Sequence, residues 1–345
     1  MVEPQMAVDK PAPLLHAWRG EFAFAVDIGG TKIALTAVDP CGRILLKPEK
    51  LLVPFASDGS ADPDQILDML KPFLEQAQRL PGKLVGIGLS CCGNIDPETG
   101  IAALAPNLHW HNLPFGMMMQ QAFALPVFAA TDVRMAILAE KIWGAAQNLS
   151  NFAWATLGTG YGGYLFLDGK LYDGVHRFAG NFGHMTLNER SGYPCGCGRN
   201  GCFESFVSGP GIARAGQAVA ERGESPFLQA ILVERTVMTR DVFAAEYAGD
   251  PGAHAILEEV LRLIAINLGG LVNTLDLEAI ILGGGVVSAF PDFIPRLDQR
   301  IRDFLMTAEA IRDLRILKES FENSSLIGAA ADVFLRQGIE MASIS

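Results

Sequence analysis

One stretch of the chain, AGNFGHMTLNERSGYPCGCGRNGCFES at 179–205, limits the possible folds more than any other. It holds Cys195, Cys197 and Cys202 within eight residues, and His184 lies eleven positions before the first of them. Three thiolates and one imidazole make a complete tetrahedral ligand set for zinc, of the closed kind found in structural sites. The interleaved glycines let the backbone turn tightly enough to bring the sulfur atoms together. Scattered core cysteines beside an unrelated histidine fit this spacing poorly, and we predict a structural zinc ion.

A zinc ion at this position would also fix two side chains beside it. A metal bound to one nitrogen of His184 leaves the other nitrogen to contact a ligand in a set orientation. Glu204 follows the last metal-binding cysteine by two residues, so the zinc-bound loop would hold its carboxylate in place. This pair indicates the wall of a binding site, and the motif implies no open metal position for catalysis.

Composition excludes several classes of function. The chain has 345 residues, enough for two domains with separate cores. Its net charge of −11 disfavours a nucleic-acid partner, which usually requires a basic patch. The cysteines outside the zinc motif are Cys41 and the adjacent pair Cys91 and Cys92, a spacing typical of reduced thiols. No apolar run is long enough to cross a membrane, and the proline-containing residues 1–20 read as a disordered tail. We therefore expect a soluble, cytoplasmic protein without a membrane partner.

Two glycine-rich turns, each between apolar strands, occur in the two halves of the chain. The segment 22–39 places Gly-Gly-Thr at 29–31, after an apolar run that ends on Asp27. The segment 152–174 places Gly-Thr-Gly at 158–160 in the same position. Backbone amides of such turns can bind phosphate, although one turn alone fits an ordinary hairpin equally well. The repetition indicates an internal duplication with two phosphate-facing turns.

Other segments place polar residues or glycines at the ends of predicted strands. The strand 125–132 ends on Asp132 where a helix begins, and a carboxylate there is stabilised by the helix amides, whether as a functional group or only as a cap. The loop 104–115 offers Asn, His and Trp, which suit sugar hydroxyls as well as surface packing. The strand 278–287 enters three consecutive glycines, which let a flat nucleoside ring approach the backbone.

Apolar periodicity predicts the remaining elements. A third strand is expected over 42–53, next to the first hairpin. Helical spacing predicts a helix over 61–80 with Asp62 as its N-cap, a long buried helix over 253–276, and a closing helix over 325–337 with small residues on one face.

In their order and spacing these motifs resemble the ROK family of sugar kinases and repressors, from about residue 22 to the end of the chain. The matching segments are DIGGTK at 27–32, GTGYGG at 158–163, the zinc motif at 183–205 and LGGGV at 282–286. The resemblance implies an actin-like ATPase (ribonuclease H-like) fold, with two α/β domains, a structural zinc ion and the active site in the cleft between the domains. It also implies a homodimer.

The resemblance implies domain limits as well. The N-terminal α/β domain would span 21–131 and be completed by a C-terminal helix at about 325–340. A larger C-terminal α/β domain, with the zinc loop, would span 132–324.

Individual residues acquire roles from the same resemblance. Asp132 matches the catalytic base that takes the proton from the attacking sugar hydroxyl, and we expect the helix N-terminus to keep it ionised at neutral pH. Substrate-binding positions match Gly93, Asn107, Thr131, Asp132, Asn181, His184 and Glu204. Nucleotide-binding positions match Asp27, Gly29, Gly30, Thr31, Lys32, Gly158, Thr159, Gly160, Gly283, Gly284 and Gly285. The implied cofactors are structural Zn²⁺, held by His184, Cys195, Cys197 and Cys202, and Mg²⁺ with ATP.

Two positions depart from the family pattern. Thr131 stands where the family usually carries Asn, and Asn181 stands where it usually carries Glu. Replacing a carboxylate by an amide removes a charge and adds donors, so an amino sugar, a ketose, a deoxy or modified sugar, or a sugar-like cyclitol is compatible with the site. Arg134, also unusual, fits either a bound anion or a pair with a surface carboxylate.

We therefore expect ATP-dependent phosphorylation of a hydroxyl, most simply a primary one, on a sugar or amino sugar. The alternatives are a kinase of a modified sugar or cyclitol, and a non-catalytic sugar sensor of the same family. A sugar-sensing repressor would carry a winged-helix domain before the first strand, and only about twenty residues precede Phe22. The sequence leaves open the sugar, the hydroxyl and the phosphate donor.

Overall fold

The computed structural model describes residues 20–342 and divides into two compact units. Unit 1 combines the chain up to Met135 with the chain from Ser325 onward, and unit 2 is Ala136–Ser324. The tail expected over 1–20 lies outside the described residues except for Gly20. Among the residues that the structure describes, no helix is long and apolar enough to span a membrane.

Unit 1 is built on a five-stranded sheet of order β3-β2-β1-β4-β8. Strands β1 and β2 form an antiparallel hairpin, whereas β4 runs parallel to β1, and β8 runs parallel to β4. The parallel strand β4 is buried over most of its length, as expected for a strand with both faces covered. The strands are Glu21–Ile28 (β1), Lys32–Val38 (β2), Glu49–Leu52 (β3), Lys83–Cys91 (β4) and Val127–Thr131 (β8).

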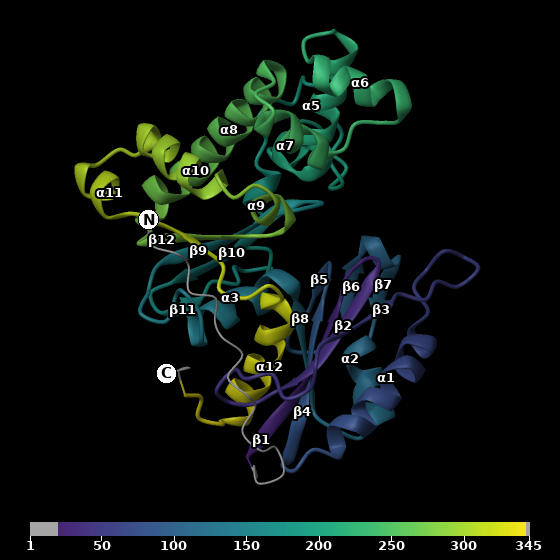
Figure 1. Ribbon diagram of the computed structural model, residues 1–345. Coiled ribbons are helices and arrows are strands. Elements are labelled where there is room, and N and C mark those ends of the chain that lie inside the picture. Colours follow the sequence, from purple (N-terminus) through teal and green to yellow (C-terminus); the bar gives the residue numbers. More distant parts are fainter. Residues whose placement is uncertain (1–19, 343–345) are drawn as a thin grey trace. The chain divides into compact units, whose positions relative to one another are not determined.

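Helices cover both faces of this sheet. Figure 1 shows α1 and α2 on one side and α12 on the other. The approach of α12 is close, since a Cβ on Gly88 of β4 would lie 2.0 Å from the carbonyl oxygen of Ala329. As predicted, the Asp62 carboxylate caps α1 by accepting from the amides of Asp64 and Gln65. These helices are Pro63–Gln78 (α1), Phe115–Phe123 (α2) and Ser324–Gln337 (α12), whereas α3 (Asp132–Ile142) follows β8 and belongs mostly to unit 2.

The expected third strand is much shorter than predicted. Only Glu49–Leu52 pairs with β2 as a strand, while Ile44 makes a single isolated bridge to Val38. Pro48 lies between these segments and has no amide proton for a ladder hydrogen bond. A separate small sheet of unit 1 has the order β5-β6-β7, with strands Asn94–Ile95, Ala102–Ala105 and Trp110–Leu113, and a 3₁₀ turn, η2, at Pro106–Leu108.

Unit 2 repeats the topology of the first sheet. Its strand order is β11-β10-β9-β12-β13. The β9–β10 and β10–β11 pairs are antiparallel, and the β9–β12 and β12–β13 pairs are parallel, as for the corresponding strands of unit 1. The predicted duplication therefore holds at the level of sheet topology. The strands are Phe152–Leu157 (β9), Tyr161–Leu167 (β10), Lys170–Leu171 (β11), Ala279–Gly283 (β12) and Arg315–Lys318 (β13).

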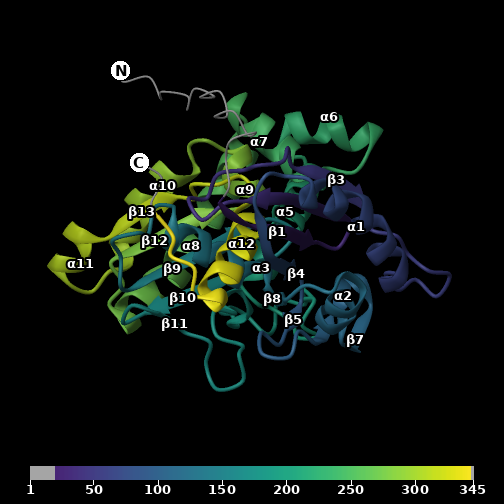
Figure 2. The same ribbon diagram turned by 90° about the horizontal axis from the view of Figure 1, so that it is seen from below.

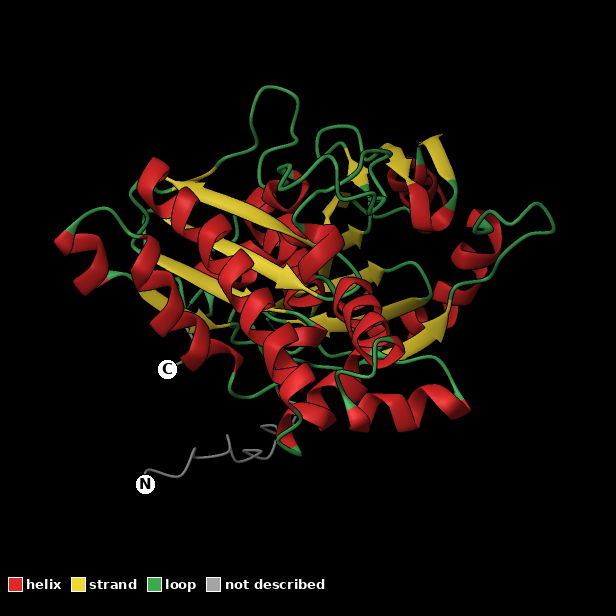
Figure 3. Ribbon diagram, turned by 90° about the horizontal axis from the view of Figure 1, so that it is seen from above, coloured by secondary structure: helices red, strands yellow, loops and turns green. Residues whose placement is uncertain are grey.

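Helices α4, α5, α7 and α10 of unit 2 pack on α8, which spans Pro251–Leu275 and buries much of its surface (Figures 1 and 2). Helices and strands can be followed by type in Figure 3. The other helices are η3 (Phe182–His184), α4 (Glu204–Val207), α5 (Gly209–Glu221), α6 (Pro226–Glu234), α7 (Thr239–Tyr247), α9 (Gly285–Ala289), α10 (Phe293–Ile301), η4 (Arg302–Phe304) and α11 (Ala308–Asp313).

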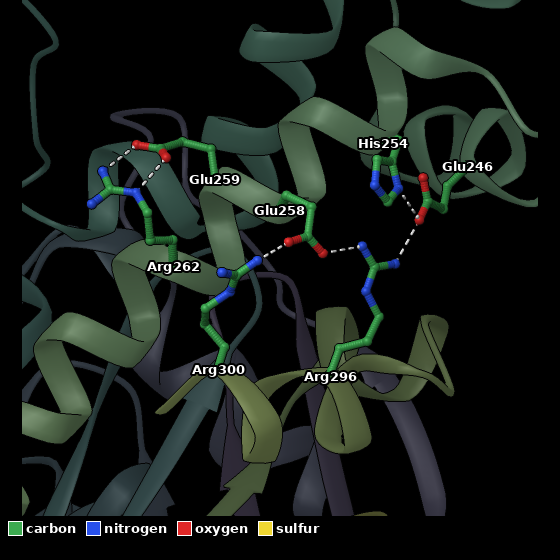
Figure 4. A network of polar contacts seen from close by, with 7 residues as sticks. All are labelled: Glu246, His254, Glu258, Glu259, Arg262, Arg296 and Arg300. Carbon is green, nitrogen blue, oxygen red and sulfur yellow. Dashed lines mark hydrogen bonds and ion pairs between the residues drawn. The ribbon is translucent and has the colours of Figure 1, made fainter. Parts of the chain in front are cut away.

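An ion-pair network joins three of these helices at their polar faces (Figure 4). Arg296 of α10 contacts Glu246 of α7 at 2.5 Å and Glu258 of α8 at 2.7 Å. Arg300 also contacts Glu258, and His254 contacts Glu246. Because each carboxylate is shared between two basic groups, the network fixes α7 and α10 on α8.

Candidate functional site

The four predicted metal ligands come together in unit 2. The ligand atoms of His184, Cys195, Cys197 and Cys202 all lie within 4.8 Å of one another. His184 Nδ1 is 3.4 Å from Cys195 Sγ, and Cys197 Sγ is 3.6 Å from Cys202 Sγ. Tetrahedral zinc, with bonds of about 2.3 Å to sulfur and about 2.0 Å to nitrogen, places two sulfurs about 3.8 Å apart and a sulfur and a nitrogen about 3.5 Å apart. The cluster therefore fits a closed zinc site.

Glycines in this loop allow the close backbone contacts that hold the cluster. Gly201 has a φ of 73°, and a Cβ there would lie 1.7 Å from the carbonyl oxygen of Asn188. The amide of Gly198 donates to the carbonyl of Cys195 at 3.0 Å, which closes the turn between the ligands. A side chain at 201 would push apart the two segments that carry the ligands.

Glu204 lies between the cluster and the second glycine-rich turn. Its Oε2 accepts from the amide of Tyr161 at 2.9 Å, and its Oε1 lies 3.2 Å from Cys195 Sγ and 3.9 Å from His184 Nδ1. A Cβ on Gly160 would lie 2.7 Å from Oε2. Unit 2 therefore brings the predicted substrate residues His184 and Glu204 beside the turn 158–160.

Asn181, another predicted substrate residue, immediately precedes η3. Its side chain is exposed, and its Nδ2 donates to the carbonyl of Phe178 at 2.9 Å. One of the two N–H donors of the Asn181 amide, which a glutamate would lack, therefore binds the protein backbone.

Unit 2 also contains a pocket of about 590 Å³ that joins two predicted nucleotide-binding segments. Gly158 and Thr159 line it from the second turn, and Gly285 lines it from the triple glycine. Much of the remaining lining is apolar, which suits a flat aromatic ring. Sequence reasoning missed six lining residues, because they carry no motif and lie on helices or on the loop before α7: Pro210, Ala213, Val237, Met238, Phe243 and Ala289.

The triple glycine adopts a conformation that requires glycine. Gly284 has a φ of 94°, and a Cβ there would lie 2.4 Å from the carbonyl oxygen of Leu157. Its amide donates to Glu319 Oε1 at 3.0 Å. A Cβ on Gly283 would lie 2.2 Å from the same carboxylate. Glu319, which the sequence did not single out, therefore holds this turn.

Unit 1 gathers the remaining candidate residues at the carboxyl ends of β1, β4 and β8. Cys91 of β4 lies opposite Ile28 of β1 and Thr131 of β8. Asp27 and Asp132 are the chain neighbours of Ile28 and Thr131, so they lie near each other, and their charges interact. Asp132 begins α3, and its Oδ1 accepts from the amide of Val133 at 2.9 Å. Thr131 Oγ1 accepts from the amide of Arg134 at 3.3 Å.

The electrostatics of Asp132 differ from our expectation. Burial, and then the charge of Asp27, raise the pKa of Asp132 to about 6 against the lowering effect of the Val133 amide. The helix N-terminus therefore lowers the pKa of Asp132 by less than burial and the Asp27 charge together raise it. A carboxyl with a pKa of about 6 is still about nine-tenths ionised at pH 7. Burial also raises the pKa of Asp27, although Ser90 and Ser325 donate hydrogen bonds to it.

The first glycine-rich turn packs against the predicted substrate loop. The amide of Gly29 donates to the carbonyl of Lys32 at 2.9 Å, which closes the turn around Thr31. A Cβ on Gly30 would lie 2.8 Å from the Cβ of Asn107. Gly93 has a φ of 104°, and a Cβ there would lie 2.5 Å from the carbonyl oxygen of Leu104. Unit 1 thus places Gly93, Asn107 and the turn side by side.

Arg134 contacts a carboxylate of its own unit. Its NH1 lies 3.4 Å from Oδ1 of Asp332 on α12, and the Asp332 side chain is 4% exposed. The carboxylate is therefore buried, whereas the sequence suggested a surface partner.

Comparisons with known proteins agree with these features. A sequence model of the ROK family matches residues 23–335. A glucokinase of Halalkalibacterium halodurans is 32% identical over 283 residues, which cover 81% of this chain and 85% of that protein. An N-acetylmannosamine kinase of Vibrio cholerae is 31% identical over 280 residues, covering 81% and 88%. A xylose repressor of Bacillus spizizenii is 27% identical over 282 residues, covering 82% and 69%.

A solved structure is similar over nearly the whole chain. A ROK family glucokinase from Streptomyces griseus, in complex with glucose and AMPPNP, superposes with a TM-score of 0.74 at 28% identity, covering 90% of this chain and 98% of that one.

Proposed function

The chain belongs to the ROK family and has the actin-like ATPase fold, and from this premise we propose that it is an ATP-dependent kinase acting on a sugar hydroxyl. The observation that carries the proposal is the Asp132 carboxylate at the carboxyl end of β8, next to Asp27 and largely ionised at pH 7. The similar glucokinase and N-acetylmannosamine kinase support the same class of reaction.

Asp132 would act as the general base. Phosphoryl transfer depends mainly on positioning and on stabilising charge, and Mg²⁺ bound with ATP supplies the charge neutralisation at the phosphates. Asp132 would accept the proton of the attacking hydroxyl and orient the oxygen. Ionised carboxylate is required for both tasks, and its raised pKa makes it a better proton acceptor than an ordinary aspartate.

Three of the predicted substrate residues would contact the sugar through their side chains. His184 has Nδ1 on the side of the sulfur cluster, so zinc there would leave Nε2 to contact a sugar hydroxyl. Glu204 would accept from a second hydroxyl, and Asn107 would contribute an amide. The turns 29–31 and 158–160 would bind phosphates through their amides, with the nucleoside in the pocket beside Gly285.

The two departures from the family pattern favour a substrate other than glucose. Thr131 Oγ1 accepts from a backbone amide, and Asn181 Nδ2 donates to a backbone carbonyl. Both positions therefore use a polar contact within the protein, and the sugar meets no carboxylate at 181. An amino, deoxy or otherwise modified sugar, or a cyclitol, fits this pattern.

A panel assay tests the proposal. Zinc-loaded protein is given ATP, Mg²⁺ and single members of a panel that includes glucose, N-acetylmannosamine, ketoses, deoxy sugars and cyclitols, and ADP release is followed. We expect substrate-dependent ADP release with at least one member, and T131N/N181E should shift the preference toward glucose. The absence of release with every member, in protein shown to be folded, would contradict a kinase function.

A non-catalytic sugar sensor is the second candidate, favoured by the similarity to xylose repressors. The variant D132N separates the two functions. A kinase should lose about 10² to 10⁴ in kcat while its sugar affinity, measured by calorimetry, stays within about threefold. A sensor should bind sugar and show no turnover in either form.

A further inference from the structure

A buried polar pair lies behind the zinc cluster in unit 2. Asn267 of α8 is 1% exposed, and its Oδ1 accepts from Tyr161 Oη at 2.7 Å. Tyr161 is itself 2% exposed. Asn267 Nδ2 donates to the carbonyl of Phe182 at 3.2 Å and lies 3.4 Å from Met185 Sδ. Both polar side chains are therefore satisfied inside the core.

The pair contacts every element that carries a proposed sugar ligand of this unit. Phe182 begins η3, the 3₁₀ turn that ends on His184. The Tyr161 and Phe182 rings meet edge to face with centroids 5.6 Å apart, and a Cβ on Gly183 would lie 1.7 Å from the Tyr161 carbonyl oxygen. Tyr161 also donates its amide to Glu204, and it directly follows the turn 158–160.

We propose that Tyr161 and Asn267 are positioning residues that set His184 and Glu204 relative to the turn 158–160. The proposal rests on the proposed function for its effect on sugar binding. The Tyr161 amide holds Glu204, while its hydroxyl, through Asn267, holds the segment of His184. A small displacement of either ligand changes the fit of one sugar to both, and outer hydrogen bonds around a metal ligand typically change metal affinity by about 10- to 100-fold.

A purely structural role makes a different prediction. Removing one partner leaves the other buried and unsatisfied, so Y161F and N267L should each lower stability. The double variant Y161F/N267L leaves no unsatisfied group between the two side chains and should recover most of that stability. If the pair instead positions His184 and Glu204, that effect is lost in the single variants and stays lost in the double variant.

The test measures zinc release to a chelator without ATP or sugar, together with the thermal midpoint and, on an accepted sugar, kcat and KM. We expect zinc release about tenfold faster in both single variants and in the double variant, with a sugar KM about tenfold higher and a smaller change in kcat. Y164F is the control, because Tyr164 lies on the same strand but donates to Asp173. It should match the wild type.

The positioning role would be overturned if both the rate of zinc release and the stability of Y161F/N267L returned to the wild-type values. Wild-type protein that is inactive on every sugar would refute the proposed function alone, because the zinc measurement needs no substrate and still decides this inference.

Discussion

The acid limb of the pH–rate profile tests the interaction between Asp27 and Asp132. Burial and the Asp27 charge raise the pKa of Asp132 from 3.8 to about 6. If ionised Asp132 is the base, kcat/KM falls below neutral pH in proportion to its ionised fraction. Activity should be half-maximal at about pH 6 and about one-tenth of maximal at pH 5. The substitution D27N removes the neighbouring charge, so the acid limb should move to lower pH.

The size of that movement has an upper limit. The whole displacement is about 6 minus 3.8, or about 2 pH units. Burial is the larger cause and the Asp27 charge the second, while backbone hydrogen bonds offset part of both, so the movement in D27N should be smaller than the contribution of burial, which stays in place. The absolute rate should also fall, because Asp27 lies next to the first glycine-rich turn, which we propose binds phosphate.

The assay is steady-state ADP release from pH 4.5 to 8.5, at constant ionic strength and saturating MgATP. D39N is the matched control, because Asp39 is a buried aspartate of unit 1 that binds Arg43 and the backbone near β2. Its acid limb should match the wild type. An acid limb near pH 4 in the wild type, or one that does not move in D27N, would refute this account of the base.

Three further outcomes follow from the geometry. D132N should be more stable than the wild type at pH 8 by up to about 3 kcal/mol, which is about 2 pH units at 1.36 kcal/mol each. The difference in stability should vanish as pH falls from about 6 to about 4, because folded wild-type protein binds the proton on Asp132 more tightly than the unfolded chain does. Urea unfolding at each pH measures this difference. G284A should weaken binding of a nonhydrolysable ATP analogue at least tenfold by calorimetry, because of its positive φ and the Leu157 carbonyl, whereas G270A, which meets no atom within 4 Å, should not. C202S should lose zinc and unfold at lower temperature in a thermal scan, and C41S should keep its zinc; equal zinc content in the two would contradict the ligand set.

The sequence predicted local features well and long-range electrostatics poorly. The four candidate metal ligands lie within one short stretch, so residue types and spacing sufficed to predict that their side chains come together. The pKa of Asp132 depends on Asp27, far away in the chain, which only the parallel pairing through β4 brings close. The lining residues Val237, just before α7, and Phe243, within it, carry no motif, because any apolar side chain at these positions satisfies the pocket equally well.

The duplicated sheets carry different side chains at corresponding positions. In unit 1, Asp27 of β1 lies opposite Ser90 of β4. The corresponding pair in unit 2 is Thr156 of β9 opposite Gly283 of β12. The same topology therefore presents an aspartate on β1 of unit 1 and a threonine on β9 of unit 2, where the Glu319 carboxylate accepts from the Gly284 amide instead. A carboxylate on the central strand suits proton transfer and a metal bound with phosphates, whereas the backbone amides of a glycine-rich turn suit the phosphates themselves.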